Sequence, residues 1–143
     1  MPKNIASPQL STIDAVDFFA YNTFMENKLH AVLSVRLFTD EKCFGPGIAQ
    51  LLRRVETQHS LRAAAISMGM AYSKAWTILK SSQKALGFPL LYSTTGGKNG
   101  GGAILTPEAK QLLTAYEEYC TMLNAYAQNL FMEKFQPFVE ESL

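Results

Sequence analysis

The hydrophobic positions near the N-terminus predict a short helix followed by a strand. Within residues 1–28, four apolar residues recur at helical spacing, so this N-terminal extension is expected to carry an amphipathic helix; they are Ile13, Val16, Ala20 and Phe24. From Leu29 to Phe38 every second residue is apolar, which is typical of a half-buried strand. The sequence FGPG at 44–47 then breaks the chain.

The central part of the chain predicts three consecutive helices. Aliphatic residues follow an i, i+3, i+4, i+7 pattern through residues 47–58. Ser60 is a suitable N-cap for a second helix over residues 61–68. A third helix is predicted over about 71–86, and Gly87 is suited to end it.

A glycine-rich hairpin is predicted after the helices. Residues 88–95 and 103–105 are interpreted as strands, and the glycines of STTGGKNGGGAILT between them as the hairpin tip. This loop does not match the phosphate-binding P-loop motif, because Tyr92 stands where the motif needs a glycine and Asn99 where it needs serine or threonine. The tip is therefore either structural or a contact for something other than a mononucleotide.

The C-terminal part predicts one long helix. Thr106, Pro107 and Glu108 form a helix start, and no helix breaker follows before Pro137, so a helix of about 30 residues is expected. Six apolar residues are spaced 4, 3, 4, 3 and 4 apart, which indicates a heptad seam; they are Leu112, Tyr116, Tyr119, Leu123, Tyr126 and Leu130. A second copy of the chain is the expected partner of this dimerisation seam. The alternative is that the helix folds back on its own domain.

The segment LRAAAISMGMAYSKAWTILK has the layout of a helix-turn-helix. Ala65 is followed four residues later by Gly69, and apolar residues follow the glycine by one, six and nine positions (Met70, Ala75 and Ile78). Small residues allow two helices to cross closely, and the glycine allows the turn between them. With a helix before it and a glycine-tipped hairpin after it, this segment predicts the winged helix-turn-helix order.

The elements together predict a fold that is mainly α with a small β-hairpin, a winged helix-turn-helix followed by a long C-terminal dimerisation helix. The expected divisions are an N-terminal extension (1–28), a winged helix-turn-helix DNA-binding domain (29–105), the dimerisation helix (106–136) and a tail (137–143).

The outward face of the third helix is the candidate surface for recognising DNA bases, and is called the reading face below. If Ala75, Ile78 and Leu79 face the core, six hydroxyl and lysine residues face away: Ser73, Lys74, Thr77, Lys80, Ser81 and Lys84. Short hydroxyls and lysines suit the major groove of DNA. The alternative is an ordinary solvated face, which is preferred for Lys84. Tyr72 and Trp76 are interpreted as a buttress between this helix and the hairpin, and a phosphate contact from the Tyr72 hydroxyl stays open.

Charge is distributed unevenly along the chain. Residues 45–110 hold eight basic and two acidic side chains and carry a net charge of +6, whereas the flanks carry −5. A basic middle favours a polyanionic partner at one face, because like charges add to a strong local potential. Arg53, Arg54, Arg62 and the lysines are therefore candidates for phosphate contacts.

The sequences SMGMAYSKAW and TGGKNGGGAILT resemble the DNA-binding domain of the ModE-type molybdate-responsive regulators, which is related to the LysR-type winged helix-turn-helix domains. EKCFGPG at 41–47 is similar to short regulators of that family, and the resemblance runs from about Leu29 to about Tyr126. It implies a dimeric transcriptional regulator that contacts DNA through Tyr72, Ser73, Lys74 and Thr77 of the reading helix and through Lys98 and Asn99 of the wing. Arg62 and Lys80 complete the expected DNA-binding set.

The chain departs from the family in ways that limit what the resemblance implies. It is expected to be a short form that lacks the molybdate-binding domains, and no SARNQ-like oxyanion motif occurs in it, so molybdate sensing is not expected. Gln58 and His59 stand where the family has a glycine before the second helix. Ser93 and Thr94 stand where it often has a basic residue.

Other functional classes receive little support from the sequence. Cys43 and Cys120 are too few for a disulfide framework and are interpreted as reduced thiols. No leader and no apolar run of membrane length occur, so a cytoplasmic protein without a membrane partner is expected. No metal site, cofactor or enzymatic activity is expected, because no cluster of catalytic residues and no nucleotide loop is present.

Two functions remain after the sequence analysis. The first is sequence-specific binding of double-stranded DNA by a homodimer that regulates transcription. The alternative is a winged-helix protein-interaction module that binds a separate sensor or partner protein. An unidentified effector stays open in both.

Overall fold

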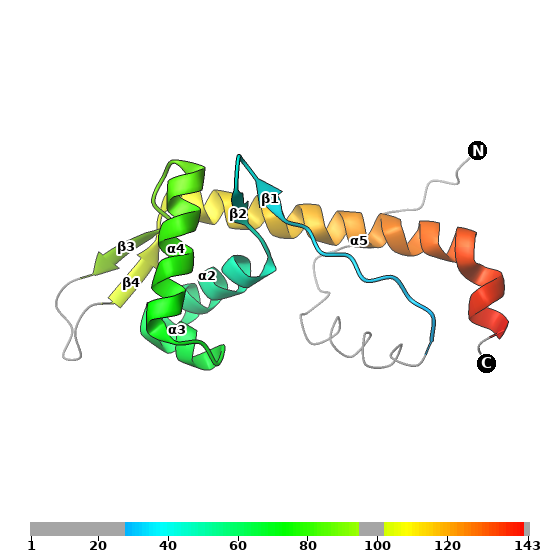
Figure 1. Cartoon of the computed structure of the whole chain (residues 1–143), viewed down its shortest axis with the longest axis horizontal. Helices are drawn as coiled ribbons and strands as arrows, with labels where there is room; N and C mark the ends of the chain where they lie inside the picture. The colour runs from blue at the N-terminus through cyan, green and yellow to red at the C-terminus, as the bar shows by residue number, and fades with distance from the viewer. Residues whose placement is uncertain (1–27, 95–101, 142–143) are drawn as a thin grey trace. The chain divides into compact units, whose positions relative to one another are not determined.

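The computed structural model describes residues 28–94 and 102–141, so the helix expected within residues 1–28 lies outside the described residues (Figure 1). Residues 34–120 form one unit, and the described residues 28–33 and 121–141 belong to a second. The elements in chain order are β1 (Leu37–Phe38), β2 (Lys42–Phe44), α2 (Pro46–Gln58), α3 (Leu61–Ser67), α4 (Tyr72–Leu86), β3 (Leu91–Thr94), β4 (Gly102–Leu105) and α5 (Pro107–Glu141).

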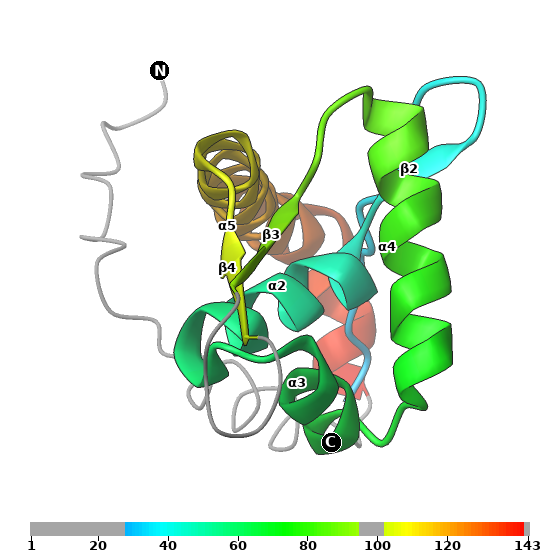
Figure 2. The same cartoon turned by 90° about the vertical axis from the view of Figure 1, so that its left-hand side faces the viewer.

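The predicted fold class is confirmed. The described chain is mainly α, with a small antiparallel hairpin and a long C-terminal helix, in a winged-helix-like arrangement. Within residues 34–120, α2 lies between α4 and the β3–β4 hairpin (Figure 2). None of the helices in the described part of the chain combines the length and apolar character that a membrane span requires.

The core of the 34–120 unit is built from the apolar faces of its helices. Leu51, Leu52 and Val55 of α2 are almost completely buried, as are Ala64 and Ala65 of α3. The start of α5 closes the same core; its buried residues there are Ala109, Leu113 and Tyr116. The small side chains of α3 allow α4 to cross it closely, as the helix-turn-helix pattern predicted.

The predicted caps and stops are present. The Ser60 hydroxyl accepts a hydrogen bond from the Ala63 N–H at 3.1 Å, and the Thr106 hydroxyl accepts one from the Ala109 N–H at 3.0 Å. These bonds satisfy amide groups that a helix start leaves without partners. Gly69 (φ +68°) and Gly87 (φ +84°) adopt the left-handed conformation after α3 and α4, which glycine adopts without steric cost.

The hairpin is tied to the end of α2. β3 and β4 pair in antiparallel register from Leu91 with Leu105 to Thr94 with Gly102. The Ala103 N–H donates to the His59 carbonyl oxygen at 2.9 Å. A Cβ atom at position 102 would lie only 2.9 Å from that same oxygen, so the close approach of the two backbones requires a glycine there.

The strand predicted over Leu29–Phe38 is wrong for most of its length. Only Leu37–Phe38 pairs with a neighbour, the three-residue β2. A strand requires a partner for its backbone hydrogen bonds, and alternation of side chains does not supply one. The Val35 carbonyl oxygen instead accepts a hydrogen bond from the Tyr116 hydroxyl at 2.8 Å.

The expected boundaries at Phe88 and Pro137 also differ from the structure. Strand β3 begins at Leu91 rather than at Phe88: Pro89 has no N–H to donate, and the Leu90 N–H donates to the Gln83 side chain at 2.8 Å instead of to a strand. Helix α5 continues through Pro137 to Glu141 instead of ending at residue 136. Proline removes only one N–H donor, so the helix can continue past it. Its last turns change direction, as a proline kink does, in the red part of the ribbon (Figure 1).

Tyr116 belongs to the core of its own domain. It is 7% exposed, and its ring meets that of Phe44 edge to face at 5.0 Å between centroids. Burial, and to a smaller extent the hydrogen bond with Cys120, raise the pKa of the Tyr116 hydroxyl to about 12. Leu112 also packs against this core. Leu112 and Tyr116 therefore pack against their own domain, as the alternative to a dimer seam expected. The exposed part of the seam begins at Tyr119.

Truncation of Leu52 tests how strongly the core holds the 34–120 unit. Leu52 has no exposed surface, so Leu52→Ala removes three carbon atoms and leaves a cavity. We expect the free energy of unfolding to fall by about 3 kcal/mol. Ile66→Ala is the matched control, because Ile66 is 67% exposed and its truncation should cost less than about 0.5 kcal/mol. Equal losses in urea unfolding would contradict the assignment of the core.

Candidate nucleic-acid interface

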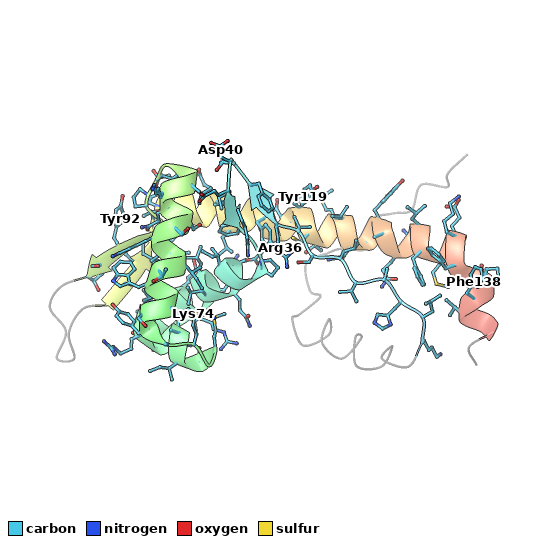
Figure 3. The ribbon with its side chains drawn as sticks, in the orientation of Figure 1. Arg36, Asp40, Lys74, Tyr92, Tyr119 and Phe138 are labelled. Atoms are coloured by element: carbon cyan, nitrogen blue, oxygen red, sulfur yellow. The ribbon has the colours of Figure 1, made fainter. Side chains whose placement is uncertain are left out.

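The outward face of α4 carries only hydroxyl groups and ammonium groups among its polar side chains. All six residues expected to face away are exposed: Ser73, Lys74, Thr77, Lys80, Ser81 and Lys84. No aspartate or glutamate occurs on α4. Figure 3 labels Lys74 near the N-terminal end of this helix. Within the part of the chain that the structure describes, Lys74 and Lys84 form no ion pair, so no described carboxylate neutralises their charges.

Arg62 is stacked on an aromatic ring at the start of α4. Its guanidinium carbon lies 4.4 Å from the centroid of the half-buried Tyr72 ring. A guanidinium that stacks through its face keeps its N–H donors at its edge. The contact therefore holds a cation at the junction of α3 and α4 and leaves donors available for a phosphate.

A second cation lies over a ring one turn further along α4. The Lys80 ammonium is 5.3 Å from the centroid of the Trp76 ring, and Trp76 is half-buried. The two residues are four apart, the spacing at which helical side chains meet. Tyr72 and Trp76 thus each support a basic residue, and both pack against the core. Their predicted role as a buttress toward the hairpin stays a prediction.

The hydroxyls of α4 are not equivalent. Thr77 donates its hydroxyl proton to the carbonyl oxygen of Ser73 at 2.9 Å. No hydrogen bond to another described residue involves the Ser73 hydroxyl. Ser73 can therefore donate or accept toward a ligand, whereas Thr77 in this arrangement offers only lone pairs.

Arg53 and Arg54 are less suited to phosphate contacts than the sequence analysis expected. Arg53 is bound by Glu117 and by Glu56, the latter at 2.8 Å. The hydrogen bond with Glu117 raises the pKa of the Arg53 guanidinium. The guanidinium keeps its positive charge, and the carboxylates of Glu117 and Glu56 compensate it. Arg54 donates to the carbonyl oxygen and hydroxyl of Ser67 at 2.8 and 2.9 Å. Sequence counts of charge do not reveal such pairing, because Glu117 lies 64 residues away from Arg53.

The base of the predicted wing is described, but its tip is not. Tyr92 of β3, labelled in Figure 3, and Ile104 of β4 are cross-strand neighbours and are 49% and 45% exposed. Lys98 and Asn99 lie outside the described residues. In the described ranges, no group of three His, Cys, Asp or Glu side chains could hold a metal ion, and Cys43 and Cys120 are free thiols.

The expected dimerisation residues beyond the core differ in exposure along α5. Tyr119 and Tyr126 are 56% and 69% exposed, Leu130 is 41% exposed and Leu123 is half-buried. Figure 3 labels Tyr119 on this helix.

The two cation–ring contacts were not predicted from the sequence. The spacing of Trp76 and Lys80 was a sufficient signal for one of them, since residues four apart on a helix are neighbours. The contact between Arg62 and Tyr72 could not be read from spacing. It depends on how α3 and α4 cross.

The chain has similarity to curated proteins but to no family model. No protein-family model matches it. The molybdenum-pterin-binding protein MopB of Rhodobacter capsulatus is 38% identical over 66 residues, 46% of this chain and 24% of that protein. The transcriptional regulator ModE of Haemophilus influenzae is 39% identical over 72 residues, 50% of this chain and 28% of that protein.

A third relative has a more explicit name. The DNA-binding transcriptional dual regulator ModE of Escherichia coli K12 is 31% identical over 85 residues, 59% of this chain and 30% of that protein. The chain thus spans less than a third of the length of each of these three relatives. The similarity relates the chain to ModE and MopB proteins over about half of its own length.

Proposed function

We propose that this chain is a DNA-binding transcriptional regulator in which α4 enters the major groove of duplex DNA. The observation that carries the proposal is the exposed face of α4, which presents hydroxyls and lysines without an acidic side chain. These groups match the donors and acceptors of base edges and phosphates. The names of the Haemophilus and Escherichia relatives, a transcriptional regulator and a DNA-binding transcriptional dual regulator, support this function.

The residues of this face have separate roles in the proposal. Ser73, Lys74 and Thr77 are nearest the N-terminal end of α4 and meet base edges, as recognition helices do with their first turns. Arg62 and Lys80, supported by Tyr72 and Trp76, bind phosphates on either side. The Tyr72 hydroxyl is a further phosphate donor.

The glycine-rich segment between β3 and β4 is proposed as the wing. Glycines allow a backbone to approach the duplex closely, and Lys98 and Asn99 then reach the flanking backbone or the minor groove. Molybdate sensing is no part of this proposal.

A homodimer through α5 completes the proposed function. Tyr119, Leu123, Tyr126 and Leu130 repeat at heptad spacing, and three of the four are more than 40% exposed. Large apolar side chains exposed at this spacing are typical of a helix that packs against a second helix. Two copies would present two α4 helices to two half-sites.

Substitution of Lys74 tests the reading face. We expect Lys74→Ala to weaken binding to the preferred duplex by about 10- to 100-fold and to relax the base preference at one position, since a lysine contact with guanine is lost. Binding is measured by gel retardation with the duplex that the wild-type chain selects from a random-sequence pool.

Lys84→Ala is the matched control for this experiment. Lys84 is also an exposed lysine of α4, but it lies ten residues, or about 15 Å, further along the helix. We expect its removal to change the affinity by less than about threefold. Equal effects of the two substitutions would argue that α4 contributes only general charge.

The alternative function, a winged-helix module that binds a partner protein, has one observation in its favour. Met132, Phe135 and Phe138 are exposed and lie outside the heptad seam; Figure 3 labels Phe138. Recovery of a stoichiometric protein partner together with no retardation of any duplex would favour this module over the regulator.

A further inference from the structure

The hydroxyl of Thr77 is oriented by the helix that carries it. Thr77 is exposed on the reading face, and its proton is donated to the Ser73 carbonyl oxygen at 2.9 Å. A hydroxyl has one proton and two lone pairs, so a threonine whose proton is used in this way can only accept a further hydrogen bond. Its neighbour Lys74 has only donors. The two residues therefore present opposite hydrogen-bonding character to a base edge.

We infer that Thr77 determines specificity by accepting a hydrogen bond from an exocyclic base amine, so that its contacted position accepts adenine or cytosine and rejects guanine and thymine. In the major groove, adenine N6 and cytosine N4 are donors, whereas guanine and thymine offer only acceptors at their edges. If the Thr77 hydroxyl oxygen faced a guanine or thymine carbonyl oxygen, two acceptors would meet and neither would have a hydrogen-bond donor.

The proposed contact of Lys74 locates the base pair that Thr77 contacts within the binding site. Lys74 and Thr77 are three residues apart, which is about 4.5 Å along the helix axis, close to the separation of successive base pairs. The adenine-or-cytosine position should thus lie within one or two base pairs of the position whose preference Lys74→Ala relaxes. The inference rests on the proposed DNA binding.

The test compares wild type with Thr77→Val and Thr77→Ser by selection from a random duplex pool, followed by affinity measurements on all four bases at the position. Valine keeps the methyl group and the shape of threonine but has no acceptor. Serine keeps the hydroxyl and can make the same bond to the carbonyl of residue 73. We expect Thr77→Val to reduce the ratio of affinities for adenine or cytosine over guanine or thymine at this position by about 2- to 10-fold. Thr77→Ser should keep the wild-type ratio.

The controls separate this inference from the proposed function. Affinity for a non-specific duplex and its salt dependence should be the same for wild type and Thr77→Val, because no phosphate contact is removed. A preference that valine keeps, or a wild-type preference for guanine or thymine that valine loses, would overturn the role of Thr77 while leaving DNA binding intact. Failure of the wild-type chain to retain any duplex would overturn both.

Discussion

Raising the salt concentration from about 50 to about 200 mM should lower the affinity of the chain for its duplex by on the order of 100-fold. Arg62 and Lys80 are held over aromatic rings, and Lys74 is exposed without an ion pair to another described residue. In a dimer Arg62 and Lys80 make about four phosphate contacts, and each neutralised phosphate releases counterions, whereas Lys74 meets a base edge and adds none. The expected slope of log K against log salt is about −4.

Variants assign this slope to particular side chains. Arg62→Gln should make it shallower by about 2 in a dimer, since one contact is lost in each copy. Lys134→Gln is the control: Lys134 is an exposed lysine of α5 that lies 3.8 Å from a Glu133 oxygen, and the slope should not change. A wild-type affinity indifferent to salt would remove the electrostatic basis of the proposal.

Tyr126→Glu should convert the dimer to monomers and lower the affinity for a duplex with two half-sites by about 100-fold or more. Tyr126 is 69% exposed at a seam position of α5, where a carboxylate would face its symmetry mate in a dimer. Linked binding modules gain affinity because the second contact is intramolecular, and that gain is lost in a monomer. Sedimentation equilibrium gives the mass, and retardation gives the two affinities.

A matched variant separates loss of the dimer from loss of the reading face. Thr114→Glu adds the same charge to an exposed position of α5 that lies away from the seam, and it should leave a dimer. Affinity for a single half-site should be the same in all three proteins. A wild-type chain that sediments as a monomer at the concentrations at which it binds DNA would remove the homodimer from the proposal.

The sequence predicted those features that depend on neighbouring residues. The caps Ser60 and Thr106, the stops at Gly69 and Gly87 and the exposed face of α4 all follow from local spacing, and the structure has each of them. Such features depend on the conformation of a few consecutive residues and on one helical period.

Features that depend on distant partners were not predictable. The alternation from Leu29 resembled a strand, but β2 supplies a partner for only its last two residues. The heptad spacing could not distinguish a partner's apolar surface from the core of the same domain, which is where Tyr116 packs. The sequence suggested that Arg53 was available for phosphate, although it forms an ion pair with Glu117 in the folded chain.

We propose above all that the α4 face binds duplex DNA in a sequence-specific way. Selection of duplexes from a random pool by the purified chain, followed by footprinting of the recovered sequences, tests it most directly. We expect a two-fold symmetric motif whose half-sites lie about one helical turn apart, with protection in the major groove that Lys74→Ala weakens. Recovery of no common sequence, with retention no greater than that of Lys74→Ala, would contradict it.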